Sequence, residues 1–221
     1  MKYITGYVYC DCAELQTNEE SLCLVQAEFD RTEVILACVC DGKAVGASVT
    51  KQLKLWLAEK GERLAGSKTA ARRLTESFEQ ECLRLEKEVQ EAADRRDGNA
   101  RLNLAGILIV GQECVLLQNG DGCICLLNRR FQQSHRRFLN IRQKESGWAV
   151  ARAQMEQQVG ILIGGAGFLK GIDDRMLPQC LAVQEIGQDT QIDKRLQALA
   201  QERRRQGYAG SCSAVLVERL I

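Results

Sequence analysis

Histidine, proline and long apolar runs are all scarce in this sequence. His135 is the only histidine and Pro178 the only proline among 221 residues. A lone imidazole argues against a zinc centre built from histidines and cysteines. It also leaves a cysteine nucleophile without an evident base, because no orienting acid lies close to His135 in the sequence. No apolar run approaches the roughly 20 residues of a membrane span, so we expect no transmembrane helix.

A strong net charge and an export signal are also lacking. Thirty lysines and arginines offset 29 acidic residues, which leaves a net charge of +1 and no general reason to expect nucleic acid or an anionic membrane as partner. The first residues, MKYITGYVYCDC, contain no apolar stretch and no small-residue cleavage site, so they do not resemble a signal peptide. We therefore expect a cytoplasmic protein.

Cysteine, in contrast, is abundant, with 11 residues. An odd number without an export signal is typical of free thiols in a reducing compartment. Three pairs are spaced two apart, which places both sulfurs on one face of a strand: Cys10/Cys12, Cys38/Cys40 and Cys123/Cys125. This is not the spacing of zinc ribbons, so we interpret these cysteines as small core residues, with a zinc site as the alternative.

The most informative stretch is EVILACVCDG, residues 33–42. Seven apolar residues run into an Asp-Gly pair, and the run is short and rich in β-branched residues. It therefore predicts a strand buried on both faces. Asp41 then lies at the rim of a sheet, where Gly42 lets the backbone approach closely whatever the carboxylate holds. Asp41 either caps the turn or binds a cation.

The remaining periodicity predicts an alternation of strands and helices along residues 1–221, which we expect to form a single domain with no linker or repeat. Predicted helices cover residues 45–60 (ending at Gly61), a segment from the N-cap Ser67 to about residue 97, residues 173–186 and residues 190–206. Predicted strands cover residues 2–12, 22–29, 33–41, 159–167 and 212–220, with an antiparallel meander over residues 104–128 that turns at 111–113 and 119–122. This order predicts an α+β fold: a four-layer αββα sandwich of two antiparallel sheets flanked by helix pairs.

Residues 129–144 form a local basic segment, RRFQQSHRRFLNIRQK. Interleaved basic and aromatic residues suggest an RNA-binding patch, but the rest of the chain is not basic. We interpret the segment as a surface loop that attracts an acidic or phosphorylated partner, with these candidate partner-binding residues: Arg129, Arg130, Arg136 and Arg137.

The element order and several short motifs resemble the metal-dependent protein phosphatase family, type 2C. Asn18-Glu19-Glu20 is similar to the family's N-terminal Asn-Glu-Asp, and Asp41-Gly42 matches its Asp-Gly. Gly120-Asp121 resembles a Gly-Asp pair in a central hairpin. The segment 161–172 follows the pattern of the strand that ends in Ser-Asp-Gly, and 210–220 follows the last strand, which Asp-Asn precedes.

The resemblance implies a centre of two Mg²⁺ or Mn²⁺ ions held by acidic residues, which activate water to attack a phosphate. Here Ala166 stands for the acid of Ser-Asp-Gly and Gly210 for that of Asp-Asn. Only Glu20, Asp41 and the Gly42 carbonyl remain of the expected ligand set. Two adjacent cations need several carboxylates to offset their repulsion, so we expect a disabled centre, with at most one weakly held Mg²⁺ or Mn²⁺ ion.

Two further departures concern the surroundings of this centre. Leu15 stands at the spacing of the family's phosphate-clamping Arg. Asp173 and Asp174 lie too far past the strand to replace Ala166 without a register shift, which leaves them a minor route to a rebuilt site. For Asp121, the turn sequence NGDG favours a role in a hairpin turn over metal binding.

The sequence therefore favours a catalytically impaired pseudophosphatase. It would serve as a binding or regulatory module in cytosolic phospho-signalling, with a phosphoprotein or a kinase-pathway protein as partner. The alternative is an active Mg²⁺- or Mn²⁺-dependent phosphoserine/phosphothreonine phosphatase with an altered metal site.

Overall fold

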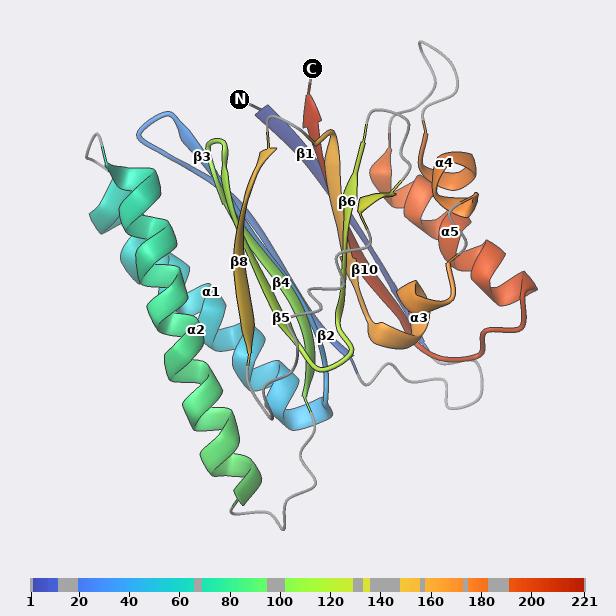
Figure 1. Ribbon diagram of the computed structural model, residues 1–221, viewed down its shortest axis with the longest axis horizontal. Coiled ribbons are helices and arrows are strands. Elements are labelled where there is room, and N and C mark those ends of the chain that lie inside the picture. The colour runs from blue at the N-terminus through green and yellow to red at the C-terminus, as the bar shows by residue number, and fades with distance from the viewer. Residues whose placement is uncertain are drawn as a thin grey trace.

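In the computed structural model, two five-stranded antiparallel sheets pack face to face, and helices cover both outer faces (Figure 1). The predicted four-layer αββα fold is confirmed. The structure describes residues 2–11, 20–65, 69–94, 102–128, 133–135, 148–155, 158–172, 175–182 and 191–220.

The first sheet, here called the β3 sheet, has the strand order β2-β3-β4-β5-β8. Its strands are β2 (Glu20–Phe29), β3 (Thr32–Asp41), β4 (Asn103–Val110), β5 (Glu113–Asn119) and β8 (Ala149–Gln154). The outer face of this sheet is covered by α1 (Lys43–Ala65) and α2 (Ala70–Asp94).

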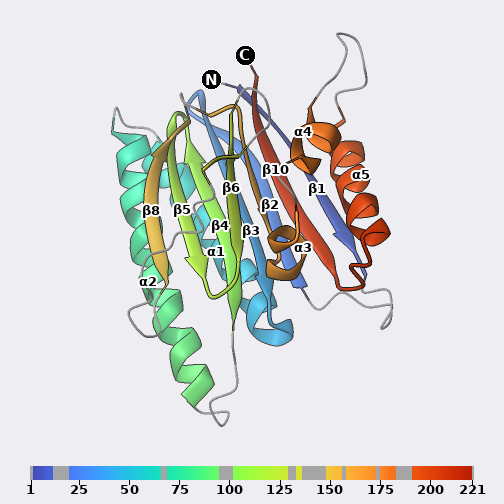
Figure 2. The same ribbon diagram turned by 45° about the vertical axis from the view of Figure 1, so that its right-hand side comes forward.

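The second sheet, the β10 sheet, has the order β1-β10-β9-β6-β7. Its strands are β1 (Lys2–Cys10), β6 (Cys123–Leu127), β7 (Gln133–His135), β9 (Gly160–Gly164) and β10 (Cys212–Leu220). Its outer face is covered by α3 (Ala166–Lys170), α4 (Met176–Leu181) and α5 (Ile192–Arg205) (Figure 2). The first and last strands pair, Lys2 opposite Leu220, so the described ends of the chain lie side by side.

The run Val34–Cys40 lies at the centre of the molecule, as its composition predicts. Every residue of the run is at most 2% exposed. Even-numbered side chains pack under α1 and α2, and odd-numbered ones pack between the two sheets. The alternation brings Cys38 Sγ and Cys40 Sγ to 3.3 Å on the helix side, and both thiols lie in the core.

A two-residue turn joins β2 to β3. Asp30 and Arg31 both have positive φ, 46° and 61°, as a type I′ hairpin turn requires. The turn fixes a register in which Phe29 faces Thr32 and, at the far end of the hairpin, Glu20 faces Asp41. The short turn therefore determines which side chains meet at the other end of the sheet.

The predicted three-strand meander over residues 104–128 is wrong in its second turn. β4 and β5 pair as expected, but β5 then pairs with β8, whereas β6 belongs to the other sheet and pairs with β9 and β7. Residues 119–122 are thus a crossover between sheets. Gly122 lies so close to Leu104 that a Cβ atom would overlap the Leu104 carbonyl. Turn residues alone do not distinguish a hairpin from such a crossing.

Several predicted boundaries also change. α1 does not end at Gly61 as predicted but continues to Ala65. Gly61 lies against the Phe29 ring, where a Cβ atom would collide, so its place in the helix reflects packing and not a helix end. Pro178 is the third residue of α4, where the missing N–H costs nothing. The strands β7 and β8 and the short helix α3 were not predicted, while the proposed N-cap Ser67 lies outside the described residues.

A buried ion pair fixes α5 to the β10 sheet. Arg195 Nη2 lies 2.7 Å from Glu218 Oε2, and both side chains are 9% exposed. Arg195 Nη1 also donates to Glu218 Oε1 at 2.7 Å and to the Leu181 carbonyl at 2.6 Å, which connects α4 as well. Such bidentate geometry is what makes a buried pair tolerable.

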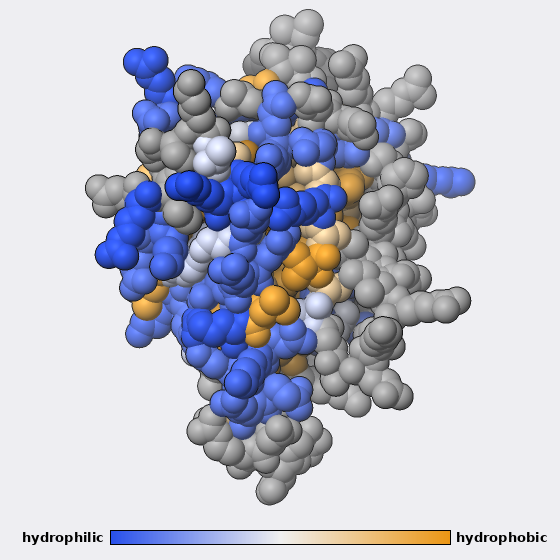
Figure 3. All heavy atoms as spheres, turned by 60° about the vertical axis from the view of Figure 1, so that its left-hand side comes forward, coloured by the Kyte–Doolittle hydropathy of each residue, from blue (hydrophilic) through white to orange (hydrophobic). Residues whose placement is uncertain are grey.

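The outer face of α1 and α2 is largely hydrophilic (Figure 3). It also carries the exposed side chains of Leu55 and Leu83. None of the described helices is both long and apolar enough to cross a membrane.

Candidate functional site

Polar residues from successive strands gather at one end of the β3 sheet, near the start of α1. Glu20 is the first residue of β2 and faces Asp41, the last residue of β3. Asp41 in turn faces Asn103, the first residue of β4. Because neighbouring strands are antiparallel, the start of one strand meets the end of the next, and these three side chains line one edge.

Asp41 is held by an amide. Asn103 Nδ2 donates to Asp41 Oδ2 at 3.2 Å, and Asn103 Oδ1 accepts the Asp121 backbone N–H at 2.9 Å. Asn103 thereby connects Asp41 to the crossover between the sheets. The Gly42 carbonyl accepts the Gly46 N–H at 2.6 Å and so begins the hydrogen bonding of α1. Two of the three groups that were expected to bind a metal, Asp41 and the Gly42 carbonyl, therefore also stabilise the ends of β3 and α1.

Asp121 lies in the crossover, not in a hairpin turn, which corrects the predicted setting of this residue. Its backbone N–H is bonded to Asn103.

Glu20 reaches from the β3 sheet to the β10 sheet. Its carboxyl group accepts hydrogen bonds from the side chain and backbone of Ser213. It also lies against Gly165, where an added Cβ atom would overlap Glu20 Oε1. Burial raises the pKa of Glu20 from 4.5 to about 7, and the charge of Asp41 adds to the rise. At neutral pH, Glu20 is thus protonated in a large part of the molecules.

The Tyr208 side chain lies beside Gly210 and beside Gly167, which follows Ala166 in the sequence. Ala166 is the first residue of α3, and Gly210 precedes β10. Cβ atoms added to Gly167 and Gly210 would each lie 2.6 Å from Tyr208 Oη, so the phenol hydroxyl fills the space between them. The hydroxyl donates to the Ser211 carbonyl at 3.0 Å.

Arg203 fixes the tyrosine in this place. Its guanidinium lies 4.9 Å from the centre of the Tyr208 ring, a cation–π contact. Arg203 Nε donates to the Phe168 carbonyl at 3.1 Å and Nη2 to the Gly167 carbonyl at 3.4 Å, which ties α5 to α3. Burial, followed by the charge of Glu20, raises the pKa of Tyr208 to about 12. The phenol is therefore neutral at physiological pH.

These residues do not fit a two-metal centre. Mg²⁺ and Mn²⁺ prefer carboxylate oxygens, and two adjacent ions need several of them. In the part of the chain that the structure describes, no three histidine, cysteine or acidic residues are grouped so that they could hold a metal ion. Glu20 and Asp41 are brought together, while the neutral phenol of Tyr208 lies beside Gly167 and Gly210 and Arg203 donates to the Gly167 carbonyl.

Sequence reasoning missed Tyr208 and Arg203. Arg203 belongs to an arginine run in a surface helix, and Tyr208 to a short polar connection, so neither pattern indicates a central position. Other predicted residues lie outside the described part of the chain: Leu15, Asn18, Glu19, Arg129, Arg130, Arg136, Arg137, Asp173 and Asp174.

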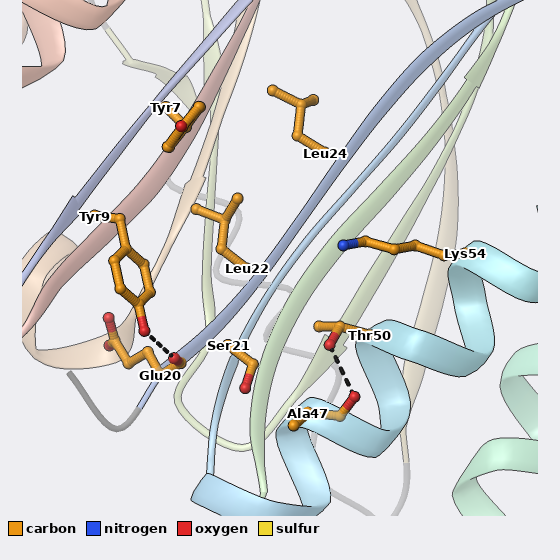
Figure 4. A pocket seen from close by; sticks show the side chains of 9 residues that line it. All are labelled: Tyr7, Tyr9, Glu20, Ser21, Leu22, Leu24, Ala47, Thr50 and Lys54. Atoms are coloured by element: carbon orange, nitrogen blue, oxygen red, sulfur yellow. Dashed lines mark hydrogen bonds between the residues drawn. The ribbon is translucent and has the colours of Figure 1, made fainter.

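A groove begins beside Glu20 and follows the edge of the sandwich (Figure 4). Its volume is about 550 Å³. We call it the β2 groove, because β2 forms its floor while β1 and α1 form its walls. The lining residues are Tyr7, Tyr9, Glu20, Ser21, Leu22, Leu24, Ala47, Thr50 and Lys54.

Comparison with known proteins rests on structure alone. No protein-family model matches the sequence, and no curated protein is significantly similar to it. The serine/threonine phosphatase Stp1 from Staphylococcus aureus superposes with a TM-score of 0.70 at 12% identity, over 100% of this chain and 96% of that one. PppA of Pseudomonas aeruginosa, described as a key regulatory component of the T6SS, gives 0.66 at 14% identity, over 100% and 99%.

The phosphatase domain of SpoIIE from Bacillus subtilis is a third similar structure. Its TM-score is 0.57 at 15% identity, over 98% of this chain and 92% of that one. These likenesses span 98% or more of this chain and 92% or more of the others. They confirm the fold that the sequence motifs suggested: the chain has the fold of the type 2C protein phosphatases.

Proposed function

We propose that this protein is a pseudophosphatase, a phosphatase fold that acts by binding and not by hydrolysis. The observation that carries the proposal is the set of side chains that meet at the ends of β2 and β3. Two carboxyl groups, Glu20 and Asp41, meet there, and the Tyr208 side chain fills the space beside Gly210. A reaction that depends on paired cations would lack the anionic wall that neutralises them.

The state of Glu20 also supports this proposal. Burial disfavours its charged form and raises its pKa to about 7, so the protein groups around Glu20 are not arranged to stabilise a carboxylate. Asp41 is already engaged by Asn103 at 3.2 Å. We propose that it binds a phosphoprotein or a kinase-pathway protein in the cytoplasm, where its many free thiols would remain reduced.

Hydrolysis of p-nitrophenyl phosphate with Mn²⁺ tests the proposal. We expect no Mn²⁺-dependent rate above that of a protein-free control. The matched variant is Asp41→Ala, which removes one of the two carboxyl groups and should leave the measured rate of hydrolysis unchanged. A Mn²⁺-dependent rate that Asp41→Ala abolishes would refute the proposal.

The alternative is an active Ser/Thr phosphatase with an altered metal site. Its support is the pairing of Glu20 with Asp41, since two adjacent carboxylates are the start of a cation site. This alternative requires further ligands, and it predicts that Mg²⁺ lowers the pKa of Glu20 by competing with the proton. Chemical shifts of the Glu20 carboxyl carbon across a pH series, with and without the diamagnetic Mg²⁺, distinguish the two proposals.

A further inference from the structure

We propose that the β2 groove binds an extended peptide segment of a partner protein, which adds to the edge of β2 as an extra strand. The segment would carry apolar side chains that alternate with an acidic one. This inference deepens the binding role proposed above by naming the surface and the chemistry of the partner.

The floor of the groove is an open sheet edge. Among the strands that the structure describes, β2 is the terminal one of its sheet and pairs on one side with β3. The Glu20 carbonyl points away from β3, because it accepts the Tyr9 hydroxyl at 3.0 Å. Backbone groups alternate in direction along a strand, so the N–H and C=O groups of Leu22 and Leu24 also face the groove. An edge of this kind is a template for a further strand.

The neighbouring edge strand is treated differently. In β1, the Tyr7 N–H donates to Asp193 Oδ1 of α5 at 2.7 Å, and the Tyr3 N–H donates to Glu33 Oε2 at 3.0 Å. Side chains thus cover the outward backbone groups of β1 at two points. Natural proteins commonly protect edges in this way, which makes the open stretch of β2 at Leu22 and Leu24 informative.

The two walls of the groove have distinct chemistry. On the β1 side, the rings of Tyr7 and Tyr9 are 50% and 46% exposed, and tyrosine is favoured in recognition surfaces because it combines apolar area with a polar tip. On the α1 side, Thr50 and Lys54 stand one turn apart, and the Lys54 ammonium group extends toward the groove (Figure 4).

This contrast specifies the peptide. Side chains of an added strand point alternately to the two walls. Those that face Tyr7 and Leu22 are expected to be apolar, and the one that faces Lys54 is expected to be Asp or Glu. The groove volume of about 550 Å³ suits a short segment of this kind.

The test begins with a random twelve-residue peptide library displayed on phage and selected on the full chain. We expect enriched sequences in which apolar residues flank an acidic one. A labelled synthetic copy of an enriched peptide then serves as the probe. Lys54→Glu should weaken its binding about tenfold, whereas Lys51→Glu, the same charge change at an exposed position of α1 outside the groove, should leave it unchanged.

The backbone contact has its own variants. Leu24→Pro removes the N–H that faces the groove and keeps the pairing with β3, because an edge strand tolerates proline on its free side. Leu24→Ala retains the N–H and is the matched control. We expect a loss of about tenfold or more for proline and a smaller loss for alanine. Circular dichroism establishes that each variant is folded.

Hydrogen exchange provides a readout that does not depend on any variant. The Leu22 and Leu24 amides should exchange faster in the free protein than the Cys23 amide, and they should gain protection when the peptide binds. The proposal is overturned if no peptide is enriched, if binding is equal in Lys54→Glu and Lys51→Glu, or if these amides gain no protection. Protection that appears on concentration without peptide would instead identify a second copy of this chain as the occupant.

Failure of this proposal is distinguishable from failure of the proposed function. A Mn²⁺-dependent phosphatase rate would end the pseudophosphatase assignment and leave the peptide data standing. Absent peptide binding would remove the groove as a recognition surface and leave the inactive centre in place.

Discussion

Replacing Glu20 by glutamine tests the electrostatics of the centre. Glu20 is buried between the sheets beside Asp41, and its pKa rises from 4.5 to about 7. The folded protein therefore holds this proton more tightly than the unfolded chain does. The stabilising contribution is fully present below about pH 4.5 and is lost as the pH rises to about 7.

The size of the effect follows from the shift in pKa. The change from 4.5 to about 7 corresponds to about 3 kcal/mol of unfolding free energy. Glutamine keeps the shape and does not ionise. The stability of Glu20→Gln relative to the unmodified protein should therefore increase by about 3 kcal/mol between pH 4.5 and pH 8. This increase does not depend on how the two proteins differ in stability at pH 4.5.

Urea unfolding in EDTA at a series of pH values measures this difference. The matched control is Glu28→Gln, on the same strand but exposed, which should show no comparable pH-dependent gain. Equal pH profiles for the two variants would refute the account of Glu20. A relative stability of Glu20→Gln that falls with pH would show that the protein stabilises Glu20 as a carboxylate.

Three other substitutions test the surrounding structure. Arg195→Met should reduce the unfolding free energy by about 3–5 kcal/mol, because Glu218 is left buried without its partner; the double variant with Glu218→Leu should recover most of this in urea titrations, and additive losses would contradict the pairing. Gly122→Ala should lower the thermal midpoint sharply, because its Cβ would overlap the Leu104 carbonyl; an unchanged midpoint would argue against the crossover. Tyr208→Phe should cost about 1 kcal/mol through loss of one hydrogen bond; a gain in stability would show that the hydroxyl is not satisfied where the structure places it.

The sequence was sufficient to predict the layers but not the route of the chain between them. The run Val34–Cys40 and the helix periodicities indicate which residues are buried. A strand buried on both faces implies that its sheet is covered on both sides, here by helices and by the second sheet. The segment around Gly122 has the residues of a hairpin turn, yet the chain crosses to the other sheet there. Which sheet a strand joins depends on long-range pairing, and the residues of a turn do not indicate that pairing.

The ends of β2 and β3 were predictable as the place where carboxyl groups meet, since Glu20 and Asp41 are paired there. That Ala166 and Gly210 stand for lost ligands stays a prediction from the motifs. The position of Tyr208 could not be predicted, because it depends on the close approach of Gly167, a residue about 40 positions away in the sequence. The open edge of β2 is likewise a property of the whole sheet, and it became visible only when the strand order was known.

Calorimetric titration of the full chain with Mn²⁺ tests the central claim most directly. The account predicts no saturable two-ion isotherm at millimolar metal, because two carboxyl groups, Glu20 and Asp41, meet in the described part of the centre and the phenol of Tyr208 fills the space beside Gly210. Tight binding of two ions, lost in Asp41→Ala, would contradict the account and restore an active phosphatase.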